Sequence, residues 1–331
     1  MVSAKFSIGR EEKVATAGSC FAQHIALKLQ AMGFNYFVAE QAEGVPAEIA
    51  RSRGYGVFSA RYGNIYTVPQ LLQLFLRAHG NFNPLEDHWI RPDGRFADPY
   101  RPNVEAGGFE SLQSLRDDRA SHLEKVRTMF RETDVFVFTL GLTEGWRSRR
   151  DGAVFPLAPG VTAGEYDETV HEFVNFDVAQ TVEDMHAFLS LLREVNKRIR
   201  VLLTVSPVPL IATYENQHVL TATTYSKAVL RVAAESITRA LDWVDYFPSF
   251  EIITGSFNGG AYYEPDAREV TDTGVAHVMR CFAKHYLEGQ STGQSAPGEI
   301  GQASPGVDGP VPTASAVDIV CDEEAIDQVR D

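Results

Sequence analysis

The sequence predicts an α/β fold with a mostly parallel sheet that is covered by helices on both faces. Short apolar runs alternate along the chain with longer segments of helical periodicity. Residues 134–140 (DVFVFTL) and 200–205 (RVLLTV) are rich in β-branched and aromatic side chains and have the length of buried strands. Strands that alternate with helices in this way are typical of βαβ units, which build parallel sheets.

The remaining elements follow from the same patterns. Further short strands are predicted at 13–17, 35–38 and 244–247. Helices are predicted at 21–32, 68–79, 111–131, 178–196, 221–241 and 273–287. Because sites in parallel sheets form at the carboxyl ends of the strands, we expect the functional residues there.

Two internal regions and the C-terminal part depart from this alternation. Residues 80–108 are rich in Pro, Asn, Asp and aromatic residues and predict a long ordered excursion, whereas 144–176 predict a small hairpin with a loop. Residues 289–331 are predicted to be a disordered acidic tail, rich in Gly, Ser and Pro, behind a single domain spanning 1–288. Within that tail, 314–329 mixes apolar and acidic residues and is a candidate contact for a protein partner.

Composition excludes several classes of function. The 331 residues are 44% hydrophobic, enough for a sizeable core, and the net charge is −14. Since no basic face is evident, a nucleic-acid partner is not expected. No apolar run approaches the roughly 18 residues that a membrane span needs, and the start of the chain does not resemble a leader peptide. A cytoplasmic location and no membrane partner are therefore predicted.

No cofactor or metal is predicted. The three cysteines, Cys20, Cys281 and Cys321, are too few and too widely spaced for a disulfide framework or a zinc site. Neither the phosphate-binding loop of nucleotide hydrolases nor the glycine-rich dinucleotide turn occurs.

Ser19 is the first candidate for chemistry. Gly18 ends an apolar run, Ser19 follows, and a helical pattern begins at once. This arrangement places a hydroxyl at a helix N-terminus, where unpaired amides and the helix dipole favour negative charge. A serine in this position can also be an ordinary N-cap.

The pentapeptide Gly18-Ser19-Cys20-Phe21-Ala22 resembles the signature of the GSCFA family, which is similar to the SGNH/GDSL hydrolases. Three later segments resemble that family in the same order: 138–146 (FTLGLTEGW), 204–209 (TVSPVP) and 246–252 (YFPSFEI). The resemblance covers about residues 13–288. It implies a three-layer α/β/α sandwich of flavodoxin-like topology with Ser19 as nucleophile.

The resemblance also implies partners for Ser19, with departures. The Asp-x-x-His pair that supplies the base in SGNH enzymes falls on Asp266 and Glu269, so a carboxylate replaces the imidazole. An unperturbed Glu pKa of about 4.3 suits this task poorly unless burial raises it. The Asn that donates to the oxyanion in those enzymes falls at Thr143.

Other residues are expected around the oxyanion and the pocket. Gly63 and Asn64 occupy the place of the second conserved SGNH block, whose glycine amide points at the oxyanion. Gly141, Glu144 and Trp146 follow the central strand, where a substrate would meet them.

The sequence also offers other candidates for the base and a second candidate for the nucleophile. His218 follows the strand end at residue 205 and ranks first among the histidines, because loops after strand ends line such sites. His24 and His277 are secondary candidates. Cys20 is a second nucleophile whose pKa a helix N-terminus could lower.

These observations are consistent with two alternative functions of different classes. The first is a serine ester hydrolase, or an O-acyltransferase if a sugar hydroxyl replaces water, acting on a small-molecule or glycan ester. The second is a binding or scaffold protein that kept the fold but lost the catalytic histidine.

Overall fold

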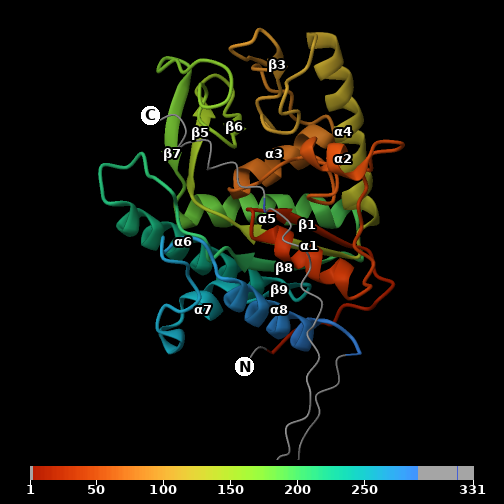
Figure 1. The fold of residues 1–331 in the computed structure, drawn as a ribbon, viewed down its shortest axis with the longest axis vertical. Coiled ribbons are helices and arrows are strands. Elements are labelled where there is room, and N and C mark those ends of the chain that lie inside the picture. The colour runs from red at the N-terminus through yellow and green to blue at the C-terminus, as the bar shows by residue number, and fades with distance from the viewer. Residues whose placement is uncertain (1–2, 290–318, 320–331) are drawn as a thin grey trace, which may run out of the picture.

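The computed structural model describes residues 3–289 and 319, and its centre is a four-stranded parallel sheet (Figure 1). The strand order is β1-β4-β8-β9, with every neighbouring pair parallel. The strands are β1 (Val14–Gly18), β4 (Val135–Leu140), β8 (Arg200–Val205) and β9 (Val244–Tyr246). The predicted parallel sheet is thereby confirmed.

Where a strand is predicted at 35–38, the structure has a single β-bridge to the sheet. Tyr36 forms an isolated parallel bridge with Val14, whose amide donates to the Asn35 carbonyl at 3.0 Å. This segment lies at the free edge of β1. Counting it as the second strand in chain order gives 2-1-3-4-5, the flavodoxin-like order.

Helices cover both faces of the sheet, as the three-layer prediction requires. Along β4, Phe136 and Phe138 point into one core, whereas Val135 and Val137 point into the other, following the two-residue period of a strand. The first core is closed by α3 (Val68–Ala78), α4 (Leu112–Glu132), α5 (Val178–Val195) and α6 (Val219–Ala240). The second is closed by α1 (Ala22–Ala31), α7 (Ser249–Thr254) and α8 (Asp272–Tyr286).

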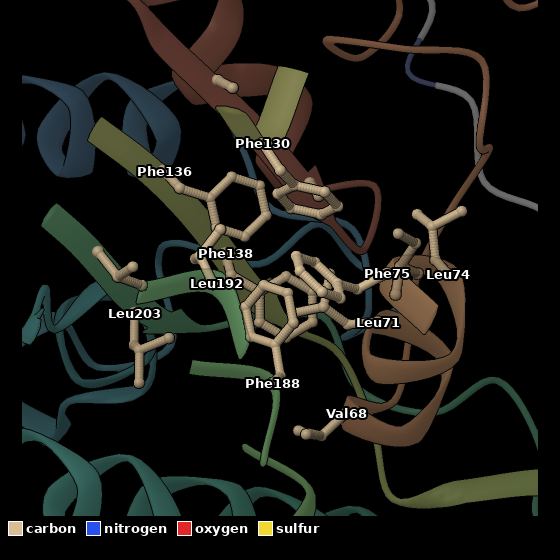
Figure 2. Close-up of a cluster of buried hydrophobic side chains, with 14 of the residues drawn as sticks. Val68, Leu71, Leu74, Phe75, Phe130, Phe136, Phe138, Phe188, Leu192 and Leu203 are labelled. Atoms are coloured by element: carbon tan, nitrogen blue, oxygen red, sulfur yellow. The ribbon is translucent and has the colours of Figure 1, made fainter. Parts of the chain in front are cut away.

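Aromatic rings fill the first core (Figure 2). Phe130 of α4 lies with its ring centroid 5.3 Å from Phe75 of α3, 5.7 Å from Phe188 of α5 and 5.5 Å from Phe136 of β4. Each of these side chains is nearly inaccessible to solvent. Burial of one such side chain stabilises a fold by about 1.5–3 kcal/mol, so this cluster fixes three helices on the sheet.

The two internal excursions form small antiparallel sheets. Within 80–108, β2 (Trp89–Ile90) pairs with β3 (Phe96–Ala97). Residues 144–176 form a three-stranded sheet of order β6-β5-β7, one strand more than the predicted hairpin. Its strands are β5 (Glu144–Ser148), β6 (Val154–Phe155) and β7 (His171–Asn175). Because β5 begins four residues after β4 ends, this sheet stands beside the carboxyl edge of the main sheet. The remaining elements are α2 (Ala47–Ser52) and the 3₁₀ helix η1 (Ser256–Asn258).

A buried ionic cluster fastens the segment between α2 and α3. The Arg61 side chain is 1% exposed and pairs with Glu105 at 2.5 Å and Asp118 at 2.8 Å. Its guanidinium lies 4.0 Å from the Tyr55 ring centroid, and its backbone amide donates to Glu40 at 2.8 Å. A charge this deeply buried is tolerated because several partners compensate it.

The predicted tail, 289–331, lies outside the described residues except for Gly289 and Ile319. Among the residues that the structure describes, every helix is too short or too polar to cross a bilayer. The cytoplasmic location stays a prediction.

Candidate active site

Ser19 lies in the turn between β1 and α1, at the carboxyl edge of the sheet (Figure 1). Its amide donates to the Thr139 carbonyl of the neighbouring strand at 3.1 Å. The preceding Gly18 has φ = 135°, and a Cβ built there would lie 2.3 Å from the Thr139 carbonyl oxygen. Only glycine fits this position, so the sequence itself brings the Ser19 backbone against the end of β4.

The Ser19 hydroxyl is buried without a hydrogen bond. The residue is 3% exposed, and its Oγ has no partner among the described residues. The N-cap of α1 is Phe21, and no side chain caps this helix. The alternative that Ser19 is an ordinary N-cap is therefore wrong. Leaving a buried hydroxyl unsatisfied costs about 1–3 kcal/mol, and such groups in native proteins often have a functional role.

A small, partly open chamber of about 10 Å³, room for about one water molecule, adjoins Ser19. Its lining comes from the ends of β1, β4 and β8, from α6, and from the loop before α3. The lining residues are Ser19, Cys20, Tyr66, Gly141, Leu142, Ser206, Val208, Pro209, Leu210 and Lys227. Besides Ser19, the lining therefore includes two further residues that the sequence predicts for the site: Cys20 and Gly141.

Lys227 is the functional candidate that sequence reasoning missed. It lies on α6, is 3% exposed, and its Nζ donates to the Gly141 carbonyl at 2.5 Å. The neighbouring Ser226 Oγ accepts from the Thr143 amide at 3.0 Å, so two adjacent side chains tie α6 to the segment after β4. This places the Lys227 Nζ at the Ser19 chamber.

A signal for Lys227 existed in the sequence. The buried face of α6 has a helical period and includes Ala222, Ser226, Lys227, Leu230, Ala234 and Ile237. A lysine on the apolar face of an amphipathic helix is uncommon, because lysine is almost never fully buried without a partner.

The three predicted bases lie elsewhere. His218 is exposed and caps α6, with its Nδ1 accepting from the Leu220 amide at 3.1 Å. Asp266 is exposed and accepts from the amides of Arg268 and Glu269 at 2.9 and 3.0 Å, which makes it a turn residue. Glu269 is exposed in the same turn. None of them bonds to the Ser19 hydroxyl, because that hydroxyl has no partner among the described residues.

The secondary histidines face α8 and the segment before it. His24 packs on Phe21 with 5.2 Å between ring centroids, and burial lowers its pKa to about 4, against a smaller raising effect of Asp272. The His277 Nδ1 lies 2.7 Å from the Tyr262 hydroxyl. Neither residue lines the chamber.

Several expected oxyanion donors are already engaged. The Ser19 amide is bonded to the Thr139 carbonyl. The Thr143 hydroxyl donates to Asn175 at 2.7 Å, and the Gly141 amide donates to the Tyr66 carbonyl at 3.0 Å. Gly63 (φ = 71°) and the 3%-exposed Asn64 belong to a loop held at β1 by the bond from the Ile65 amide to the Gly18 carbonyl, 2.9 Å. Neither lines the chamber, although both belong to a loop fixed beside it.

Glu144 and Trp146 line a second pocket next to the chamber. Tyr66, Leu142 and Leu210 line both spaces, so the two adjoin. The Glu144 carboxylate accepts from the Thr213 hydroxyl at 2.6 Å and the Tyr214 amide at 3.3 Å. Burial raises the pKa of Glu144, and these two bonds oppose that effect.

Acidic and thiol or imidazole side chains do not gather into a metal site within the described part of the chain. What the geometry does assemble is a serine at a strand-to-helix turn and a buried lysine in one chamber. The protein is an α/β protein, and this chamber lies at the carboxyl edge of its parallel sheet.

Comparison with known families agrees with this class. The sequence model of the GSCFA family matches residues 13–282, and the chain belongs to that family. No curated protein sequence matches it. Among solved structures, the acetyl xylan esterase Est2A from the rumen bacterium Butyrivibrio proteoclasticus is similar at 12% identity and a TM-score of 0.26, covering 75% of this chain and 56% of that enzyme. A TM-score this low supports no argument about activity.

Proposed function

We propose that this protein is a serine ester hydrolase in which the Ser19 hydroxyl is the nucleophile and the Lys227 amine is the base. One observation carries the proposal: the unpartnered Ser19 Oγ and the buried Lys227 line the same chamber. Neither sequence-predicted carboxylate lines it. Within the described part of the chain the two groups share no hydrogen bond, so proton transfer requires that the proton pass through a water in the chamber or that the two side chains approach each other when substrate binds.

The reaction balances with these two groups. A neutral Lys227 amine takes the proton of Ser19 while Oγ attacks the ester carbonyl. The resulting ammonium returns that proton to the departing alcohol as the ester C–O bond breaks, leaving an acyl-serine. Water then repeats the sequence and releases the carboxylic acid. One N–H of Lys227 can stay on the Gly141 carbonyl throughout.

The oxyanion needs donors other than the predicted ones. The Cys20 amide is the first candidate, because it directly follows Ser19 in the turn before α1 and Cys20 lines the chamber. The Lys227 ammonium, charged once it has accepted the Ser19 proton, adds a positive charge at the same place. Asn64 stays a candidate second donor, because it is buried on the loop fastened to Gly18.

Two alternative functions would use the same site. With a sugar hydroxyl in place of water, the acyl-serine would make the protein an O-acyltransferase. The non-catalytic alternative is supported by the small volume of the chamber, about 10 Å³, which holds about one water molecule.

Fluorophosphonate labelling separates these possibilities. The wild-type protein, Ser19→Ala and the neighbouring Cys20→Ala are treated with a fluorophosphonate probe, and p-nitrophenyl acetate hydrolysis is measured in parallel. We expect labelling and turnover in the wild type and in Cys20→Ala, and neither in Ser19→Ala. Labelling that survives Ser19→Ala would remove Ser19 from the role. A wild type that neither labels nor turns over at any pH would favour the binding protein.

A further inference from the structure

The pocket beside the Ser19 chamber is lined almost entirely by apolar and aromatic side chains. Trp146 of β5 lies with its ring centroid 4.9 Å from Tyr214 and 5.9 Å from Phe173. Leu157, Ala158 and other small or aliphatic residues complete the wall. Glu144 is the only ionisable carboxylate or cation in the lining, and both its oxygens already accept hydrogen bonds.

This chemistry favours the acyl part of an ester over a sugar. A sugar presents many hydroxyl groups, and a site that binds one needs several available polar partners. Here the polar groups are few and one carboxylate is already used to hold Thr213 and Tyr214. An apolar chain, by contrast, gains about 0.8 kcal/mol for each methylene that it buries, which is about fourfold in affinity.

The size of the pocket limits the length of the chain. Its volume is about 50 Å³, compared with about 10 Å³ for the Ser19 chamber. At roughly 10–15 Å³ for each water-sized group, this leaves room for about three or four heavy atoms. Leu210, Leu142 and Tyr66 border both spaces, so a chain whose carbonyl carbon sits at Ser19 passes between them into the pocket.

We propose that this pocket is the acyl-binding site of the enzyme and that it selects esters of short unbranched acids of about four carbons. The proposal rests on the proposed function of Ser19 as nucleophile. Trp146, Phe173 and Tyr214 form the aromatic wall, and the hydrogen bonds from Thr213 and Tyr214 to Glu144 keep the segment that closes the pocket in place.

The test is a chain-length profile with p-nitrophenyl acetate, butyrate and octanoate. We expect kcat/KM to rise about tenfold from acetate to butyrate, through two buried methylenes, and to fall again for octanoate. Ala212→Phe adds volume to the lining from a half-buried loop position and should abolish the preference for butyrate over acetate. Leu157→Ala enlarges the pocket and should move the optimum to the longer ester. Ala261→Phe, at an exposed position outside the lining, is the matched control and should keep the wild-type profile.

Fluorophosphonate labelling of Ser19 in each variant tests the nucleophile separately from the acyl pocket. If Ser19 labels but the profile is flat, or if neither pocket variant changes it, the acyl pocket is overturned and the nucleophile stands. If the wild type neither labels nor hydrolyses any of the three esters, the proposed function and the pocket fail together. If Ala212→Phe does not fold, Leu157→Ala still decides, because its effect is a gain with the longer ester.

Discussion

The Lys227 Nζ donates to the Gly141 carbonyl at 2.5 Å, which binds α6 to the chain just after β4. The two residues lie 86 positions apart in the sequence, and both line the Ser19 chamber. This hydrogen bond fixes the position of the buried Lys227 side chain at the chamber.

Lys227→Met should remove the base while preserving most of the side-chain volume. We expect kcat for p-nitrophenyl butyrate to fall by about 100-fold or more, the range for loss of a general base. Lys227→Arg should not rescue it, because a guanidinium stays protonated. Lys284→Met, on an exposed part of α8, is the matched control. Full activity in a folded Lys227→Met would leave the amine with a structural role only.

Gly18→Ala should destabilise the protein severely. The added Cβ would meet the Thr139 carbonyl at 2.3 Å in a backbone conformation (φ = 135°) that favours glycine. We expect a loss of about 3 kcal/mol in the free energy of unfolding, measured with urea. Gly107→Ala is the control, since nothing lies within 4 Å of its Cβ position, and should change stability by about 0.5 kcal/mol at most. Equal effects of the two substitutions would refute the close approach of β1 and β4.

Arg61→Met should cost about 3 kcal/mol, because it removes the buried cation that pairs with Glu105 and Asp118, although Arg101 still pairs with Asp118. The exposed Arg239 also forms an ion pair, with Glu235 at 2.7 Å, but Arg239→Met should cost about 1 kcal/mol or less. Thermal and urea unfolding of both variants measure the difference. A loss below about 1 kcal/mol for Arg61→Met would show that the cluster contributes little net stability.

His24→Gln should change how stability depends on pH. Burial lowers the pKa of His24 to about 4 from its ordinary value of 6.5, so the unfolded chain binds this proton more readily than the folded one. Below pH 6.5 the wild type therefore loses stability, up to about 3 kcal/mol near pH 4, through this group. His24→Gln should lack that loss, so the variant gains on the wild type as pH falls from 7 to 4.

Asp272→Asn provides the matched comparison for His24. The Asp272 carboxylate raises the pKa of His24, so its removal should lower that pKa further and steepen the loss of stability in acid. Urea unfolding at several pH values measures both variants. A difference between His24→Gln and the wild type that stays constant from pH 7 to pH 4 would contradict the assignment.

Most of the main sheet and its helices could be predicted from periodicity. The strands β4 and β8 carry continuous apolar runs because both their faces are buried, and the six long helices lie within about two residues of their predicted ranges. The segment around Tyr36 was harder to predict, because a single β-bridge at a sheet edge has no hydrophobic pattern of its own. The third strand of the β6-β5-β7 sheet was missed because β6 is only two residues long.

For the site, the sequence by itself determined that Ser19 stands at a strand-to-helix turn, because Gly18 and the change from strand to helix period are local features. It could not determine which group faces that hydroxyl. The resemblance to the GSCFA family implied Asp266 and Glu269, yet their turn keeps them at the surface, whereas Lys227 of α6 lines the chamber. Only the tertiary structure decided this, because packing α6 against the end of β4 brings together residues that are distant in the chain, and no sequence period records that contact.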